Sequence, residues 1–233
     1  MKQLSQRIQN FTHRYPWVGP SLWIFCLQYY LIQVVVALSF KMHYSILHNT
    51  ISDLGNTACR IYASRYVCSP LHVALNLSTV ILGLFMTIGS ILIYHEVRRN
   101  RGTLVGFSFL AIAGAGTILV GLFPENTTHN LHKIGALLPF LIGNIAILIL
   151  GFALAIPLSL RIYTILTGII SLTALGFYVN HIYLGLGIGG MERFVANPHS
   201  TWLIVFGLYF MIKRSLERKN SFNDKHVIGK AAR

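Results

Sequence analysis

Apolar residues fill the chain in long, nearly uninterrupted runs that are separated by short polar stretches. A helix needs about 20 apolar residues to cross a hydrocarbon core of roughly 30 Å, and each run is close to that length. The sixth run is the shortest, and we expect its helix to begin near Pro198, because proline suits the first turn of a helix. The pattern predicts an all-α bundle of six membrane-spanning helices, at 17–40, 72–95, 103–122, 134–156, 162–186 and 198–214.

The polar stretches divide the chain further. We expect a cytoplasmic segment in the membrane interface at 1–16, a six-helix membrane domain at 17–214 and a basic cytoplasmic tail at 215–233. Inside the domain, polar residues concentrate in three outer loops, at 41–71, 123–133 and 187–199. In the first segment Leu4, Ile8 and Phe11 share one helical face, which is typical of a helix lying on a membrane. A disordered start is the alternative.

The composition is not that of an ordinary soluble domain. Hydrophobic residues make up 54% of the chain and charged residues only 11%, whereas soluble domains have roughly 25% charged residues. The formal net charge of +13 could suggest nucleic-acid binding, but the basic residues stand in short clusters beside the apolar runs. We therefore expect a multi-pass protein in a lipid bilayer, with no nucleic-acid partner.

The basic residues also predict the orientation. With the N-terminus in the cytoplasm, the inner segments hold 14 of the 19 Lys and Arg residues, and the outer segments hold five: Lys41, Arg60, Arg65, Lys133 and Arg193. Cytoplasmic loops of membrane proteins are enriched in Lys and Arg. The asymmetry predicts a protein of the plasma (inner) membrane with both termini in the cytoplasm.

This orientation places most reactive side chains on the outer side. The outer group comprises three acids and seven of the 10 histidines: Asp53, Glu125, Glu192, His43, His48, His72, His129, His132, His181 and His199. Cys59 and Cys68 lie in the first outer loop, where an oxidising compartment would allow a disulfide. Two free thiols are the alternative. We expect the chemistry of this protein at its outer face.

Several short motifs stand out: Ile-Ser-Asp-Leu-Gly at 51–55, Gly-Leu-Phe-Pro-Glu at 121–125, His-Asn-Leu-His-Lys-Ile-Gly-Ala at 129–136, Gly-Asn at 143–144 and Gly-Gly-Met-Glu-Arg-Phe at 189–194. Together they resemble the pattern of an uncharacterised prokaryotic family of small six-helix membrane proteins. The first motif is also distantly similar to one in eukaryotic Frag1/DRAM/Sfk1-type proteins, some of which are tied to lipid-anchor remodelling, but the prolines that follow it there are absent here. The resemblance implies an architecture and supplies no activity.

Ser52 and Asp53 have two interpretations. An outer-face aspartate can orient a histidine or bind a metal ion, which would make the pair part of a catalytic site. Serine and aspartate also satisfy free backbone N–H groups at the start of a helix or turn, and Gly55 suits such a turn. The sequence leaves open a catalytic pair or a capped turn.

His129 and His132 stand three residues apart, so they would project from one face of a helix. With Glu125 or Asp53 as a third ligand they could hold a divalent metal such as zinc. Because Glu125 and Asn126 adjoin them, we expect a polar site here, with or without a metal. Histidines that merely anchor a helix at the membrane interface are the alternative.

Glu192 and Arg193 follow a glycine-rich stretch, 185–190, that indicates backbone bending or close approach. The two residues could form an ion pair that fastens a turn. Alternatively, Arg193 could bind a lipid phosphate with two hydrogen bonds. Both interpretations remain open.

Taken together, these residues favour an outer pocket that binds a lipid headgroup and catalyses its hydrolysis or group transfer. Its acid, base or metal-binding residues would be Asp53, Glu125, His129 and His132, and its substrate-binding residues Ser52, Asn126, Glu192 and Arg193. A transporter would instead carry ionisable groups at mid-membrane, where this chain has Gln28, Gln33 and Asn144. A structural or partner-binding protein, in which the motifs only lock loops together, is the third hypothesis.

The topology yields the first testable prediction. A fusion reporter that is active only in the cytoplasm should work at residue 100, at residue 160 and at the C-terminus, because these positions adjoin the basic segments. It should fail within 45–65, at 127 and at 195. Activity at 127 would invert the assignment.

Overall fold

The computed structural model describes the backbone of residues 2–231 and the side chains of residues 3–218. Among the described residues, six helical segments are long and apolar enough to cross a membrane: Val18–Leu38, His72–Tyr94, Arg101–Leu122, His129–Ala153, Leu158–Val179 and Gly187–Arg218. The predicted six-span, all-α architecture is therefore confirmed, and the chain is a multi-pass membrane protein.

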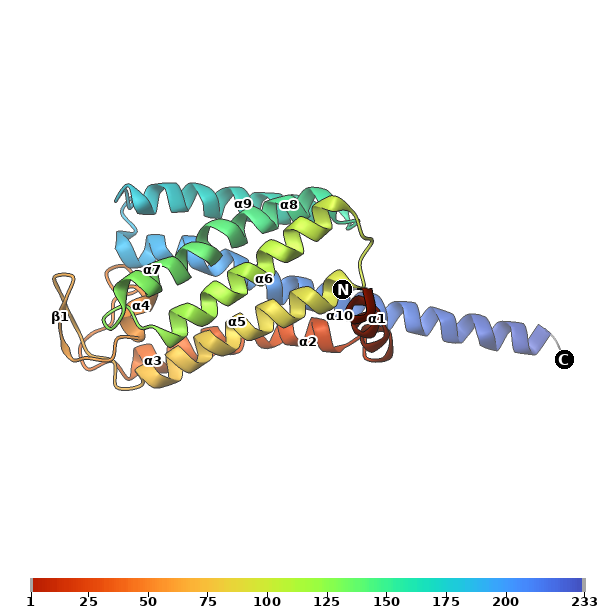
Figure 1. The fold of residues 1–233 in the computed structure, drawn as a ribbon, viewed down its shortest axis with the longest axis horizontal. Helices are drawn as coiled ribbons and strands as arrows, with labels where there is room; N and C mark the ends of the chain where they lie inside the picture. The colour runs from red at the N-terminus through yellow and green to blue at the C-terminus, as the bar shows by residue number, and fades with distance from the viewer. Residues whose placement is uncertain (1, 232–233) are drawn as a thin grey trace.

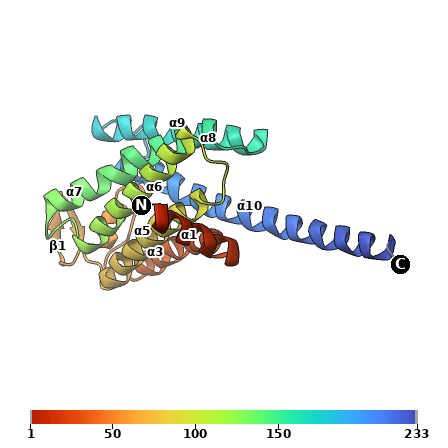
Figure 2. The same ribbon diagram turned by 45° about the vertical axis from the view of Figure 1, so that its right-hand side comes forward.

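The spans run along one common direction (Figure 1). A first helix, α1 (Lys2–Arg14), lies across the end of the bundle where the chain enters. Three spans are single helices: α5 (His72–Tyr94), α6 (Arg101–Leu122) and α9 (Leu158–Val179). The last helix, α10 (Gly187–Ala231), continues beyond the bundle on the side of α1 (Figure 2). Both ends of the described chain thus lie at the end of the bundle that is opposite the β-hairpin.

Two spans are interrupted. The first consists of α2 (Val18–Phe25) and α3 (Gln28–Leu38). The fourth consists of α7 (His129–Leu137), the π-helical turn η1 (Leu138–Gly143) and α8 (Asn144–Ala153). Pro139 stands at the start of η1, and the widened turn follows because proline has no backbone N–H for the helical ladder.

Close helix contacts and aromatic packing hold the bundle together. A Cβ atom added to Gly121 of α6 would lie 2.5 Å from the carbonyl oxygen of Asn76 on α5, so only glycine fits there. Small residues allow such approaches between membrane helices. Trp23, which is fully buried, packs against Phe107 and Trp202 from two other spans. The apolar core extends through the bundle from this cluster.

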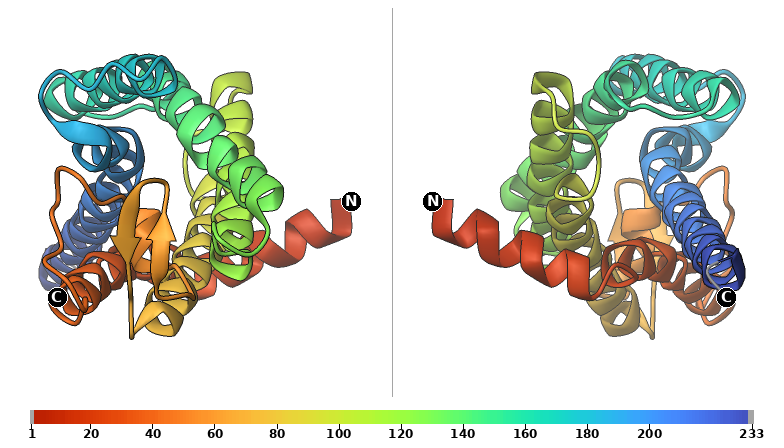
Figure 3. Two further views of the ribbon diagram at one scale, coloured as in Figure 1. Left: turned by 90° about the vertical axis from the view of Figure 1, so that its left-hand side faces the viewer. Right: turned by 90° about the vertical axis from the view of Figure 1, so that its right-hand side faces the viewer.

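The first outer loop has internal order. It contains one helical turn, α4 (Ile51–Leu54), and an antiparallel hairpin of β1 (Arg60–Tyr62) and β2 (Arg65–Val67). The hairpin turns at Ala63 and Ser64, which both have positive φ angles, as two-residue hairpin turns require. Figure 3 shows the hairpin lying across the end of the bundle that the sequence predicts to be outer; "outer" denotes this hairpin end and "inner" the opposite end. The sequence analysis did not predict this hairpin.

The predicted third outer loop, 187–199, is helical, so that prediction is wrong. The sixth helix begins at Gly187, and Pro198 lies inside it. Proline is tolerated within membrane helices where neighbouring groups bond the disturbed backbone. Here Asn144 donates to the Val195 carbonyl and Tyr30 to the Asn197 carbonyl. Residue 195 is therefore helical, and the nearest irregular outer segment is 180–186, which the sequence analysis had placed in the fifth span.

Candidate functional site

The Ile-Ser-Asp-Leu-Gly motif forms the short helix α4, and its cap fixes Ser52 in place. The Thr50 hydroxyl accepts a hydrogen bond from the Asp53 backbone N–H at 3.0 Å, and the Asp53 carboxylate accepts one from the Thr50 N–H at 3.0 Å. This reciprocal arrangement is a capping box, which satisfies two free donors at a helix start. The capped-turn interpretation of Ser52 and Asp53 therefore describes the local structure.

Asp53 is fully buried and bonded on all sides. Its two oxygens also accept from Asn49 at 3.1 Å and from the Arg65 guanidinium at 3.1 and 3.2 Å. Arg65 comes from the hairpin, which Cys59 and Cys68 close with a disulfide. With three hydrogen bonds to Oδ2 and one to Oδ1, Asp53 connects α4 to the hairpin, and it is not among the residues that line the cavity described below.

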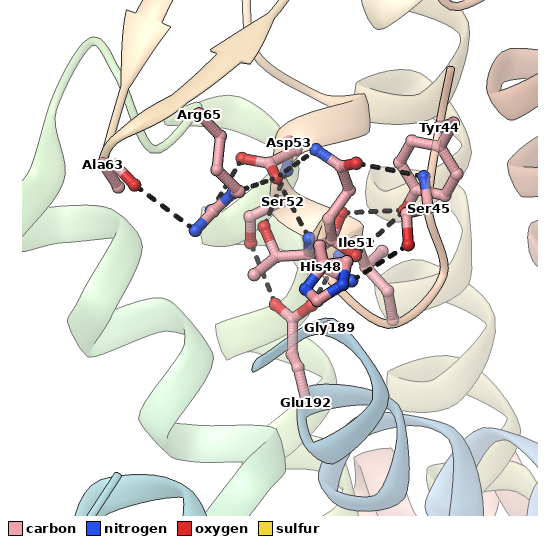
Figure 4. Close-up of polar contacts among 12 residues, drawn as sticks. Tyr44, Ser45, His48, Ile51, Ser52, Asp53, Ala63, Arg65, Gly189 and Glu192 are labelled. Carbon is pink, nitrogen blue, oxygen red and sulfur yellow. Dashed lines mark hydrogen bonds and ion pairs between the residues drawn. The ribbon is translucent and has the colours of Figure 1, made fainter. Parts of the chain in front are cut away.

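Glu192 connects α10 to the short helix α4. Its side chain is 4% exposed, and its Oε2 accepts the backbone N–H of Ile51, while its Oε1 accepts from the Ser52 hydroxyl at 3.3 Å. Figure 4 shows Glu192 pointing from α10 toward Ile51 and Ser52. The chain can approach this closely because a Cβ on Gly189 would lie 2.1 Å from the Asn49 carbonyl oxygen. The predicted close approach at the glycine-rich stretch is thus present.

His132 completes the contact among the three outer motifs. Its Nε2 lies 3.1 Å from the Ser52 hydroxyl oxygen, and its Nδ1 lies 2.9 Å from the Phe123 carbonyl oxygen. A carbonyl only accepts hydrogen bonds, so we assign the proton of the neutral ring to Nδ1. Nε2 is then an acceptor that faces Ser52. The serine hydroxyl consequently has two acceptors in reach, His132 Nε2 and Glu192 Oε1.

These residues line one cavity of about 60 Å³ inside the outer half of the bundle. Its polar lining includes Ser52, Asn76, Glu125, His132, Glu192 and His199. Tyr29, Leu82 and Phe140 contribute apolar walls. A mainly apolar pocket with a few convergent polar groups, lying between helices, is a usual setting for a binding site in a helical bundle.

Arg193 does not enter this cavity. Its NH1 donates to the carbonyl oxygens of Ile46, Asn49 and Gly189 at 3.0, 2.9 and 2.8 Å, and its NH2 donates to the Tyr44 hydroxyl. Arg193 therefore fastens the first outer loop to α10. Arg193 bonds mainly to backbone carbonyl oxygens. These contacts account for its position without an ion pair to Glu192 or a bound phosphate.

The other predicted site residues separate into different environments. His129 is exposed at the start of α7, whereas Asn126 exchanges two hydrogen bonds with Thr57, at 3.1 and 2.9 Å. Glu125 lines the cavity. Within the described part of the chain, no three His, Cys, Asp or Glu side chains are grouped to hold a metal ion. The predicted metal set of His129, His132 and Glu125 is therefore not assembled.

Two residues of the site were missed from the sequence. Arg65 had been counted only as an outer positive charge, although a basic residue in the same loop as Asp53 is a natural partner for it. His199 had been placed in an outer loop, but it lies on the cavity wall and is 3% exposed. The position of His199 is mispredicted because the sequence favours a helix start near Pro198, whereas α10 begins 12 residues before His199, at Gly187.

Comparison with known proteins gives a family and nothing beyond it. The family model described as "Protein of unknown function (DUF998)" matches residues 24–209. No curated protein matches the chain. No solved structure matches it either.

The contacts of Asp53 generate a stability prediction. Asp53→Ala should lower the free energy of unfolding by about 3 kcal/mol, because it leaves Arg65 without its buried partner. Thr50→Ala should lower it by about 1 kcal/mol through loss of the cap. Arg60→Ala, an exposed change on the same hairpin, is the matched control and should stay within about 0.5 kcal/mol. Denaturant titration in detergent measures all three, and equal effects of Asp53→Ala and Arg60→Ala would contradict the assignment.

Glu125 generates a pH prediction. Burial and the Asp53 carboxylate raise the pKa of Glu125, against smaller opposing effects of Tyr62, Arg65 and Lys133. A raised folded-state pKa means that the folded protein binds the proton more tightly than the unfolded chain, so stability falls as pH rises between the ordinary pKa and the raised one. Glu125→Gln should flatten this fall in a melting-temperature profile. Glu217→Gln, at an exposed site, should leave the profile unchanged.

Proposed function

The chain belongs to DUF998, a family of proteins of unknown function, and from its site we propose that it is a membrane-embedded hydrolase or transferase that acts on an ester of a lipid or similar amphiphile at the outer face. The observation that carries the proposal is the Ser52 hydroxyl, which lies 3.1 Å from His132 Nε2 on the wall of a cavity. A serine within hydrogen-bond reach of an oriented histidine is the usual arrangement of an activated nucleophile.

His132 has the features that a general base needs. The Phe123 carbonyl holds Nδ1–H and so directs the Nε2 lone pair at Ser52. The carbonyl thereby orients the ring, a role that a carboxylate has in Ser-His-Asp triads, although it carries no full charge to stabilise an imidazolium. Glu192 Oε1, 3.3 Å from the same hydroxyl, belongs to a carboxyl group that could provide that stabilisation.

The proposed reaction has two steps. Ser52 Oγ attacks the ester carbonyl carbon while His132 Nε2 takes the serine proton, and the bond to the leaving alkoxide then breaks as His132 returns that proton to it. An alcohol leaves, and an acyl-serine remains. In the second step water, or the hydroxyl of an acceptor, attacks the acyl carbon and gives its proton to His132, which passes it to the departing Ser52 oxygen. The products are a carboxylic acid or a new ester, and the enzyme is restored.

The size of the cavity restricts what enters it. A volume of about 60 Å³ accommodates a reacting group and little more, so the rest of an amphiphilic substrate would remain at the membrane boundary. His129 and Lys133 are exposed on the first turns of α7 and would meet an anionic headgroup there. We assign the headgroup contact to them in place of Arg193, whose NH1 and NH2 are bonded within the protein.

A non-catalytic role is the second candidate, and one observation favours it. Asp53, Arg65 and Arg193 all bond to groups of the protein itself, which is what a set of loop locks requires. In this case the hydrogen bonds among Ser52, His132 and Glu192 would only hold the loop against the helices. The two candidates differ in whether Ser52 reacts.

A covalent probe decides between them. The protein in lipid nanodiscs is treated with an alkyl fluorophosphonate, which phosphonylates activated serines, and labelling is located by mass spectrometry. Labelling is expected at Ser52, absent in Ser52→Ala and reduced at least 100-fold in His132→Gln, in line with loss of general-base catalysis of about 10²–10⁴. Ser69→Ala, which removes a structural hydroxyl bonded to the Leu54 carbonyl, is the control and should still be labelled at Ser52.

Folding is monitored for every variant by its thermal transition. If the folded wild-type protein takes no label at Ser52, the nucleophile assignment is wrong and the loop-lock role takes its place. If His132→Gln is labelled as fast as wild type, His132 is not the base.

A further inference from the structure

The cavity extends beyond the Ser52 site to His199. His199 stands seven residues after Glu192 on α10, which places it roughly 10 Å deeper in the bundle at 1.5 Å per residue. It lines the same cavity and is 3% exposed. The cavity therefore connects the outer motifs with an ionisable side chain inside the membrane domain.

Polar atoms on the cavity wall have no partner within the protein. Among the described residues, none forms a hydrogen bond with His199 Nδ1 or with Glu125 Oε2, and both atoms are buried. Leaving such a group unbonded costs about 1–3 kcal/mol, more for a charged one. Ionisable groups inside membrane domains usually face a water-filled cavity or a pathway. Two unpartnered atoms on one cavity wall thus point to a ligand with hydrogen-bonding capacity.

The chemistry of the wall restricts that ligand. A Glu125 carboxylate only accepts hydrogen bonds, whereas a neutral imidazole nitrogen donates or accepts according to its tautomer. A ligand that serves both must carry a donor, so a carbonyl or ether oxygen alone does not fit. At roughly 10–15 Å³ for each water molecule, the cavity of about 60 Å³ holds about four to six of them. Water meets both the size and the bonding requirement.

We propose that this cavity is a water-binding subsite, continuous with the outer face, in which His199 and Glu125 hold water molecules that extend from the depth of His199 to the Ser52 site. The subsite deepens the function proposed above and rests on it in one respect: the held water would be the acceptor that attacks the acyl-serine, which makes the overall reaction hydrolysis. Its oxygen bonds to the acyl carbon, its proton goes to His132, and the Ser52 oxygen leaves with that proton. The presence of the water itself does not depend on catalysis.

Accessibility to a small aqueous ion tests the subsite. In a Cys26→Ala background, which removes the buried free thiol, Ala196→Cys places a thiol on the cavity wall, and Ala174→Cys places one in the apolar cluster with Met191 and Val195. The two alanines are matched, at 8% and 6% exposure. The protein in nanodiscs is exposed to Ag⁺, and the thiols left unreacted are counted by alkylation after denaturation. The Ala196→Cys thiol is expected to react at least 10-fold faster than the Ala174→Cys thiol.

His199→Phe in the Ala196→Cys protein should slow the Ag⁺ reaction, because the ring loses its polar atoms and the cavity loses a water-binding group. Ala136→Cys, on α7 and also on the cavity wall, replaces Ala196→Cys if that variant does not fold. Equal, slow reaction of cavity and control thiols would overturn the subsite. Because the measurement involves no substrate, this outcome is distinct from a failure of Ser52 to take the fluorophosphonate label.

Discussion

The buried carboxylate of Glu192 is the constraint on which the outer half of the protein depends. A carboxylate removed from water needs donors, and among the described residues no group of α10 itself donates to the Glu192 side chain. The donors come instead from Ile51 and Ser52, more than 130 residues earlier in the chain. Docking the first loop on α10 satisfies the acid, and the docked loop in turn holds Ser52 against His132. The arrangement of the site thus follows from the need to supply hydrogen-bond donors to the buried Glu192 side chain.

Different kinds of interaction stabilise the two halves of the bundle. Toward the inner end, Trp23 packs among aromatic rings from other spans, and polar contacts such as the Glu96–Arg214 ion pair lie at the margin of this packing. Toward the outer end, interactions are directional: a capping box, a two-pronged arginine–aspartate pair and an arginine bonded to three carbonyl oxygens. Directional bonds specify position to within a fraction of an ångström, which packing of similar apolar side chains does not. A precise site is therefore easier to build at the outer end.

The sequence predicts those features that depend only on the order of residues along the chain. Hydrophobic runs predicted the six spans, because crossing a membrane sets a minimum length, and they also predicted the connecting segments at 41–71 and 123–133 but not the one at 187–199. The helix start at Gly187 was missed because glycines and Pro198 weaken local propensity, while contacts with Asn144 and Tyr30 override it. The hydrogen-bond partners of Arg193 and Glu192 cannot be predicted from the sequence for a similar reason. That Arg193 bonds loop carbonyls while Glu192 faces Ser52 depends on the rotation of α10, which no residue pattern in that helix specifies.

The distance in sequence between the contributing residues has a consequence for biosynthesis. Ser52 lies ahead of the second span, His132 opens the fourth, and Glu192 arrives only with the sixth. Chains emerge and insert from the N-terminus onward, so the loop that carries Ser52 is made long before the acid that docks it exists. Ser52 stays unpositioned through most of translation. Insertion of the last helix is then the event that assembles the site, and an incompletely inserted chain cannot form it.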